Sequence, residues 1–305
     1  MKLHRRILQF FIFVLAFSTF PTLFAQAAPH LETVRVTSGT APIAENLSLE
    51  TYTGISVTGN LTAADPDDTA FLFSVVTGPK KGTLTLQEDG AFVYTPREKC
   101  RGRDTFSYTA TDPMGNISNV AQVTVRIRRA KSAVAYADTA GTAAAYGAQY
   151  LAEQGLCIGE QVDGTWLFHP DEIMTQGEFL ALSMALSDLE PEENIAVTGY
   201  ANDGEIPVWL KPYLSAAAAS AVPAGTFADA PVFQWNEPVT DRNAALLLDE
   251  LLQLTDVVCE DAADQSAANV EACRIMTCGE TETALTRGDA ARILAAAGTF
   301  LENRN

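Results

Sequence analysis

Three threonines in the C-terminal half of the chain have the spacing of a helix N-terminal capping box. The pairs are Thr175 with Glu178, Thr240 with Asn243, and Thr286 with Asp289. In this motif the threonine hydroxyl accepts a hydrogen bond from the N3 amide, and the N3 side chain accepts one from the N-cap amide. Threonine and its partner are therefore needed for folding, which leaves the second position of each motif free to bind a ligand.

An arginine at that second position would lie at a helix N-terminus, where unpaired amides and the positive end of the helix dipole already favour an anion. Its guanidinium adds a bidentate contact to a carboxylate. Arg287 occupies the position in the third motif, Gln176 in the first, and Asp241 in the second, where Arg242 follows one residue later. We expect Arg287 to bind an anion, Arg242 to be displaced from the ideal place, and Gln176 to offer only hydrogen bonds.

The elements that must position these residues are helices. Apolar residues recur three, four and seven positions apart after the threonines, which predicts amphipathic helices, and Gly298 fits a helix C-cap. Two short motifs that precede alanine-rich helices end in Asp138 and Asp203. Each aspartate could be the N-cap of the helix that follows it. We expect residues 133–304 to form three helix–loop–helix repeats, at about 135–188, 200–255 and 262–300.

The preceding region, residues 30–130, has the period of β-strands. Polar and apolar residues alternate over 83–86 and again over 91–94, and the Asp-Gly pair at 89–90 predicts a hairpin turn. In the last segment Val123, Val125 and Ile127 would face one side. About seven such strands in about 100 residues predict an antiparallel sandwich. The change of pattern near residue 130 marks a domain boundary.

The charge of the chain is unevenly distributed. Residues 30–131 hold 11 basic and 11 acidic side chains, whereas residues 132–305 hold 6 basic and 27 acidic ones, a net charge of −21. Such a field repels nucleic acid and other polyanions at long range, so nucleic-acid binding is not expected. An anionic ligand would have to be held by short-range contacts, since the Debye length is about 8 Å at physiological salt.

The first 27 residues have the pattern of a secretory signal peptide, with Lys2, Arg5 and Arg6 before an apolar run and Ala-Gln-Ala at 25–27. A retained anchor is the alternative, but the run is shorter than the about 20 residues of a membrane span. We expect a secreted protein with no span after cleavage. The five cysteines are an odd number, so at least one is free or pairs between molecules, and Cys259, Cys273 and Cys278 are near enough in sequence to form one bridge. The other two are Cys100 and Cys157.

The helical repeats resemble S-layer-homology repeats. The resemblance rests on Tyr136-Ala-Asp138, Phe168-His-Pro170, Thr175-Gln-Gly-Glu178, Ile206-Pro-Val-Trp209-Leu-Lys-Pro-Tyr213 and Thr286-Arg-Gly-Asp289. It implies an all-α, pseudo-threefold arrangement whose grooves bind secondary cell-wall polysaccharide, often pyruvylated. The polysaccharide-binding residues it implies are Arg287, Arg242, Gln176, Asp138 and Asp203, together with Trp209, which would stack on a sugar ring or simply pack.

The N-terminal segment resembles the bacterial cadherin-like (Ig-like) repeat. The matching motifs include Val57-Thr-Gly-Asn-Leu-Thr-Ala-Ala-Asp65-Pro-Asp67, Gly90-Ala-Phe-Val-Tyr94-Thr-Pro96 and Gly102-Arg-Asp104-Thr-Phe-Ser-Tyr108. Such modules space or present other domains on surfaces, and some bind calcium or glycans. Calcium takes about six to eight oxygens, although Asp-Pro-Asp is also simply a good turn. The candidate calcium ligands are Glu45, Asp65, Asp67, Asp104 and Asp112.

No paired carboxylates, nucleophile–base pair or phosphate-binding glycine loop stands out, so we expect neither an enzyme nor a required cofactor. The sequence predicts a bacterial surface protein that is anchored non-covalently to cell-wall polysaccharide and displays its sandwich to a surface protein or glycan. The alternative is an adhesion or assembly module, with calcium as a candidate ligand, in which degenerate helical repeats are only structural.

Overall fold

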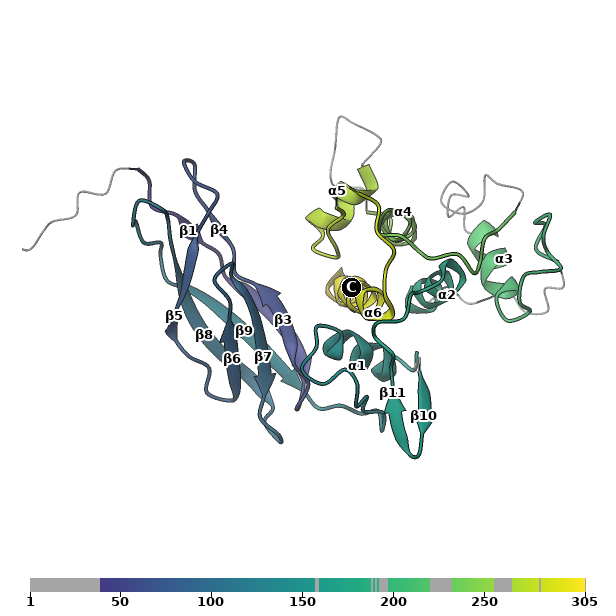
Figure 1. Cartoon of the computed structure of the whole chain (residues 1–305), viewed down its shortest axis with the longest axis horizontal. Helices are drawn as coiled ribbons and strands as arrows, with labels where there is room; N and C mark the ends of the chain where they lie inside the picture. The colour runs from purple at the N-terminus through teal and green to yellow at the C-terminus, as the bar shows by residue number, and fades with distance from the viewer. Residues whose placement is uncertain are drawn as a thin grey trace, which may run out of the picture. The chain divides into compact units, whose positions relative to one another are not determined.

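The computed structural model describes residues 39–156, 159–187, 189, 191, 197–219, 232–254, 265–279 and 281–304. A β-sandwich is followed by a helical region (Figure 1). The expected signal peptide, residues 1–27, lies outside the described residues, as do Cys157 and Cys259. Signal cleavage and the bridge therefore stay predictions.

Two sheets form the sandwich. One has four strands in the order β2-β9-β8-β5, the other has three in the order β3-β7-β6, and β1 and β4 form a separate short pair. The predicted antiparallel arrangement holds for every pair except β2 and β9, which run parallel. The strands are β1 (Ile43–Ala44), β2 (Leu47–Tyr52), β3 (Val57–Asn60), β4 (Ala63–Ala64), β5 (Leu72–Thr77), β6 (Gly82–Leu86), β7 (Ala91–Pro96), β8 (Gly102–Thr111) and β9 (Ala121–Arg128).

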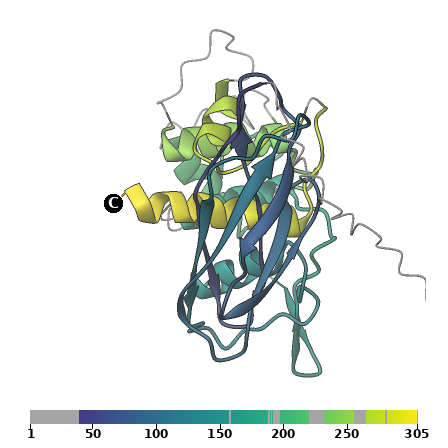
Figure 2. The same ribbon diagram turned by 90° about the vertical axis from the view of Figure 1, so that its left-hand side faces the viewer.

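The predicted hairpin and the predicted core face of the sandwich are confirmed. Strands β6 and β7 pair antiparallel, and Gly90 closes their turn with a φ of 90°. In β9 the side chains of Val123, Val125 and Ile127 are buried while the residues between them are not. Figure 2 shows the strands of the sandwich lengthwise. The period-two pattern was therefore sufficient to place this core.

The described part of the C-terminal region is mainly helical. A hairpin of β10 (Glu160–Val162) and β11 (Thr165–Leu167) also lies in it, so the all-α prediction is wrong in this respect. Its Asp163-Gly164 turn, with φ of 49° and 81°, carries the same signal as the turn at 89–90. The helices are α1 (Ala145–Glu153), α2 (Gln176–Leu186), α3 (Lys211–Ala219), α4 (Asp241–Leu252), α5 (Gln265–Ala272) and α6 (Arg287–Arg304).

Gly298 is not the predicted C-cap, because α6 continues to Arg304. The reason is helix packing. A Cβ atom at Gly298 would overlap the ring of Tyr150 in α1, and a Cβ at Gly147 would lie 2.6 Å from the carbonyl of Ala291 in α6. The two glycines therefore allow α1 and α6 to pack closely, as Figure 1 shows.

Three backbone hydrogen bonds close a ring within the helical region. The Met174 amide donates to the Leu285 carbonyl at 3.0 Å, the Leu285 amide to the Val239 carbonyl at 2.9 Å, and the Val239 amide to the Met174 carbonyl at 3.0 Å. All three side chains are buried. Each of these residues directly precedes a capping threonine, so the ring brings the N-terminal ends of α2, α4 and α6 to one place.

Candidate functional site

All three predicted capping boxes are formed. The hydroxyl of Thr175 accepts from the amide of Glu178, whose carboxylate accepts from the Thr175 amide at 3.0 Å. The second and third pairs repeat this arrangement, each with a return bond of 3.4 Å. The first turns of α2, α4 and α6 are therefore fixed by side chains of their own motifs.

The second position of each motif is not free, contrary to the prediction. Its side chain contacts the loop of a neighbouring repeat in all three cases. The contacts are Gln176 Nε2 to the Pro238 carbonyl (3.3 Å), the Asp241 carboxylate to the amides of Gly279 (3.3 Å) and Thr283 (3.1 Å), and Arg287 Nη1 to Glu172 Oε2 (2.7 Å). These side chains therefore link the repeats to one another around the ring.

The backbone amides at the helix starts are also engaged. In α6 the amides of Arg287 and Gly288 donate to the carbonyls of Glu172 and Pro170, at 2.7 and 2.9 Å, and the start of α2 makes two equivalent bonds to the loop before Val239. The prediction of an anion held by unpaired helix amides is therefore wrong at these two ends. Any anion binding at α6 depends on the Arg287 side chain.

The Arg287 guanidinium is held from two sides. It pairs with Glu172, and its central carbon lies 5.6 Å from the centre of the Phe168 ring, within range of a cation–π contact. The side chain of Arg287 is only 16 % exposed, whereas that of Glu172 is 58 % exposed. The cation is thus fixed in a mostly covered position, while its carboxylate partner reaches solvent.

A groove of about 160 Å³ connects Arg287 with Trp209. Its lining comes from all three predicted repeats and consists of Met174, Glu178, Ala181, Leu182, Trp209 and Arg287. Trp209 is 50 % exposed, so part of its ring is accessible from solvent. The groove therefore combines an aromatic face, a fixed cation and an acid, Glu178, that caps α2. The role of Glu178 in this lining was not predicted, because capping alone explained it.

Asp138 is a structural residue rather than part of the groove lining. Its carboxylate accepts from the amides of Phe168 at 2.9 Å and His169 at 2.7 Å. Burial raises the pKa of Asp138, but these hydrogen bonds outweigh burial and lower it below its usual value. The alternative that Asp138 caps α1 is wrong, since Ala144 is the N-cap. Asp138 fixes the loop that supports the cation–π contact.

Asn202, not Asp203, is the counterpart of Asp138 in the second repeat. Its side chain accepts from the amide of Phe233 at 3.0 Å and donates to the Phe233 carbonyl at 2.9 Å. Asp203 instead lies 2.6 Å from Lys211 Nζ, and this hydrogen bond lowers the Asp203 pKa to about 2. The predicted equivalence of Asp203 and Asp138 is therefore off by one residue. Asp203 ties its loop to the first turn of α3.

Arg242 does not line the groove. It is half-buried in the first turn of α4, and its amide lies 2.8 Å from the Asp241 carboxylate. The Asp241 side chain takes the place that arginine has in the third motif. The prediction that Arg242 is displaced from the ideal position therefore agrees with where the residue lies.

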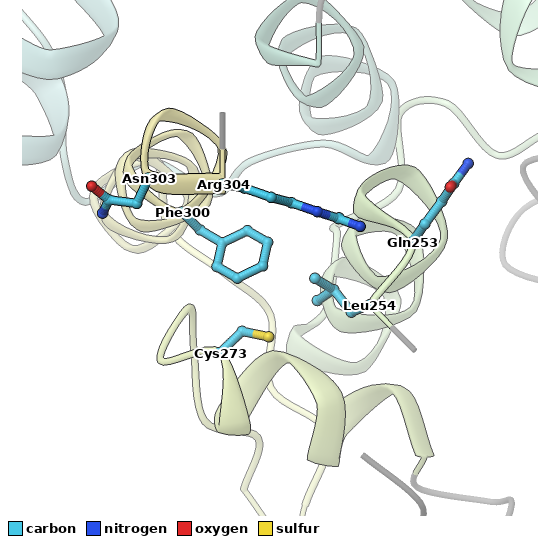
Figure 3. A pocket seen from close by; sticks show the side chains of 6 residues that line it. All are labelled: Gln253, Leu254, Cys273, Phe300, Asn303 and Arg304. Atoms are coloured by element: carbon cyan, nitrogen blue, oxygen red, sulfur yellow. The ribbon is translucent and has the colours of Figure 1, made fainter. Parts of the chain in front are cut away.

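A larger pocket, of about 270 Å³, lies at the C-terminal ends of α4 and α6. Its lining is Gln253, Leu254, Cys273, Phe300, Asn303 and Arg304. Figure 3 shows the Phe300 ring turned toward Leu254 and Cys273, with Arg304 crossing above them. Arg304 Nη1 donates to the Leu252 carbonyl at 2.7 Å, so its guanidinium caps the end of α4. None of the predicted binding residues lines this pocket, and we place the candidate site in the Arg287 groove instead.

In the sandwich, the candidate calcium ligand Asp104 is already satisfied by protein donors. It is buried and accepts from the amides of Lys80 and Lys81 at 3.0 and 2.7 Å and from the Tyr94 hydroxyl at 2.8 Å. Burial raises the pKa of Asp104, but the hydrogen bonds lower it further than burial raises it. Asp104, which lies in β8, therefore connects the turn before β6 with Tyr94 of β7.

The remaining candidate ligands lie elsewhere in the sandwich. The pKa of Asp68 is raised, mainly by desolvation and further by the negative charges of three nearby candidates, Asp112, Asp65 and Asp67. Glu45 accepts from the Thr62 hydroxyl at 3.3 Å. Within the residues that the structure describes, no three acidic, histidine or cysteine side chains are arranged to hold a metal ion. Calcium binding stays a prediction.

Comparison with known proteins identifies the sandwich. The family model described as "Bacterial cadherin-like domain" matches residues 39–129 and ends before the helical region. No curated protein is significantly similar to the chain. In the part of the chain that the structure describes, no helix is long and apolar enough to cross a bilayer. The sandwich is thus a cadherin-like domain, which fits an extracellular or surface protein.

Solved structures resemble only part of the chain. The SrpA adhesin of Streptococcus sanguinis is 19 % identical over 33 % of this chain and 67 % of its own, with a TM-score of 0.25. A SusE-like surface-located polysaccharide-binding protein of Bacteroides thetaiotaomicron is 15 % identical over 30 % and 15 %, with a TM-score of 0.21. A 2,6-sialyltransferase of Photobacterium sp. JT-ISH-224 is 16 % identical over 28 % and 18 %, with a TM-score of 0.22. The chain spans less than a fifth of the last two, and no function follows from these similarities.

Proposed function

We propose that the helical region binds a cell-wall polysaccharide in the groove between Trp209 and Arg287, and that it thereby tethers a secreted protein whose cadherin-like domain is displayed outward. The observation that carries the proposal is the convergence of residues from three repeats on one groove. The proposed role is binding rather than catalysis.

The lining suits a sugar that carries a carboxylate. The half-exposed ring of Trp209 offers a flat apolar face on which a sugar ring can lie. Arg287 offers guanidinium nitrogens that match a carboxylate such as ketal-linked pyruvate. The volume of about 160 Å³ is below the roughly 300–1,000 Å³ of pockets that enclose a whole small ligand. The groove therefore fits one unit of a polymer that continues outside it.

The ring of Met174, Val239 and Leu285 supports the resemblance to S-layer-homology repeats on which the proposal also depends. That resemblance implies three repeats around one centre, and the ring joins three repeats in a closed cycle of hydrogen bonds. The cadherin-like match to residues 39–129 supports a location at the cell surface. The proposed signal peptide would supply the export route.

One observation favours the rival function, an adhesion or assembly module whose repeats are only structural. Gln176, Asp241 and Arg287 all contact neighbouring loops. These contacts would be useful for folding alone. The rival predicts that changes in the groove leave wall binding untouched, because no wall binding through the groove exists.

Sedimentation with purified secondary cell-wall polysaccharide tests the proposal. Trp209→Ala removes the aromatic face and should weaken binding by roughly fivefold, since stacking on an aromatic ring contributes about 1 kcal/mol. Val208→Ala is the matched control, because Val208 is the adjacent residue, is 79 % exposed and does not line the groove. Equal binding by the Trp209 variant and the wild type would reject the groove as the site.

A further inference from the structure

Glu172 is bound to Arg287 through both its backbone and its side chain. The Glu172 carbonyl accepts from the Arg287 amide at 2.7 Å, and Oε2 of the Glu172 carboxylate lies 2.7 Å from Nη1 of the guanidinium. We propose that Glu172 is an internal competitor, which occupies the guanidinium until a carboxylate of the polysaccharide displaces it. This inference rests on the proposed function and assigns the regulation of the same groove.

The geometry favours exchange of one carboxylate for another. Glu172 engages the guanidinium through one nitrogen and one oxygen, whereas an incoming carboxylate can take two nitrogens in parallel. The Glu172 side chain is more than half exposed, so it can turn into solvent and be rehydrated there. Its backbone stays in place because the Arg287 amide holds it. Displacement therefore needs only a side-chain rotation.

The cation, in contrast, cannot follow its partner. The Phe168 ring lies against the guanidinium, and the side chain of Arg287 is mostly covered. When Glu172 leaves, the positive charge stays next to a groove whose other charged member, Glu178, is engaged in capping α2. An unpaired and partly covered cation is unfavourable. The open state is therefore stable only when another anion replaces Glu172.

The competitor is specific to this repeat. Glu237 occupies the equivalent place in the second repeat, since its carbonyl accepts from the Gln176 amide at 2.9 Å as that of Glu172 accepts from Arg287. Glu237, however, faces the motif whose second position is the neutral Gln176. Of these two carboxylates, that of Glu172 opposes the cation of the groove and that of Glu237 does not, so Glu237 provides a natural matched control.

One consequence is that the protein should prefer a polymer that carries carboxylate groups. A neutral sugar chain can contact Trp209, but it has no group that replaces the Glu172 carboxylate. A pyruvylated chain can do both. Wild-type protein should therefore discriminate between pyruvylated polysaccharide and the same polymer after mild acid removal of pyruvate. The Glu172→Gln variant should bind the pyruvylated polymer more tightly.

The experiment measures the dissociation constant of the full chain for pyruvylated and depyruvylated wall polysaccharide. The proteins are the wild type, Glu172→Gln, Glu237→Gln and Arg287→Ala, each checked for an unchanged melting temperature. We expect Glu172→Gln to bind the pyruvylated polymer about two- to fivefold more tightly, as removal of one partly exposed ion pair implies. Glu237→Gln should match the wild type, and Arg287→Ala should lose binding.

The outcomes separate the two proposals. If Arg287→Ala loses binding but Glu172→Gln equals the wild type, the competitor is rejected and the groove is retained. If all four proteins bind equally, or if none binds, both proposals are rejected. If the wild type binds weakly or not at all while Glu172→Gln binds, both are supported. A gain that Glu237→Gln shares would reject the competitor, because it would reflect overall charge.

Discussion

Trp209 and Arg287 line the same groove although they belong to different repeats. Neither residue is placed there by its own helix alone. The ring of three backbone hydrogen bonds sets the first residue of α6 beside α2, and the segment before α3 brings Trp209 to the same helix. A site assembled in this way is sensitive to anything that loosens the contacts between repeats.

The Asp138 carboxylate should contribute strongly to stability. Asp138→Ala leaves the Phe168 and His169 amides without their acceptor and should lower the free energy of unfolding by about 2–3 kcal/mol. Asp138→Asn should lower it by less than half as much, because Asn202 fills this role in the second repeat. Urea unfolding of the three proteins checks this. Equal losses in both variants would contradict the assigned role.

The close approach of α1 and α6 depends on Gly147. In Gly147→Ala the new Cβ would lie 2.6 Å from backbone atoms of Ala291, which should destabilise the protein by about 1–3 kcal/mol. Gly204→Ala is the control, since no atom lies within 4 Å of a Cβ there. It should change stability by less than about 0.5 kcal/mol. Thermal unfolding compares them, and a stable Gly147 variant would show that the helices pack less closely.

The Asp203–Lys211 pair should make the helical region sensitive to acid. The pKa of Asp203 is lowered to about 2 in the folded protein, against about 3.9 in an unfolded chain. Its stabilising effect is therefore complete above about pH 4 and is lost as the pH falls toward 2. Lys211→Met should reduce the fall in melting temperature between pH 5 and pH 2.5, whereas Lys131→Met should not. The same fall in all three proteins would contradict the pair's contribution.

The parts of this molecule that local sequence governs were predictable. The three capping boxes and the β6–β7 hairpin have signals within four to twelve residues, and all are formed. One prediction that was wrong concerns a position whose residue is determined by tertiary contacts. Gly298 looks like a helix end because only the neighbouring helix requires a glycine there.

The site was predictable only in part, for the same reason. Trp209 and Arg287 were named as binding residues and share one groove. The Glu172–Arg287 pair joins two repeats, so no spacing within either motif could reveal it. The shift from Asp203 to Asn202, in contrast, was open to sequence reasoning. Asn202 lies two residues after Tyr200, as Asp138 lies two residues after Tyr136, but the match of residue type favoured Asp203.

Ionic strength provides a further test of how an anionic polymer is bound. Residues 132–305 carry a net charge of −21, which repels a polyanion at long range. Salt screens this repulsion more effectively than it screens the contact with the mostly covered Arg287. Raising sodium chloride from 50 to 200 mM should therefore leave sedimentation with cell walls unchanged or slightly stronger. A steep loss would indicate binding by exposed basic residues instead.

The most direct measurement is the dissociation constant of the full chain for pyruvylated cell-wall polysaccharide, with and without the Arg287 side chain. Arg292→Ala is the matched control, because Arg292 lies in the same helix, is exposed and pairs with Asp289 three residues earlier. We predict that Arg287→Ala weakens binding at least about tenfold, as loss of a charged bidentate contact implies, while Arg292→Ala binds like the wild type. Equal binding by the wild type and both folded variants would contradict the account.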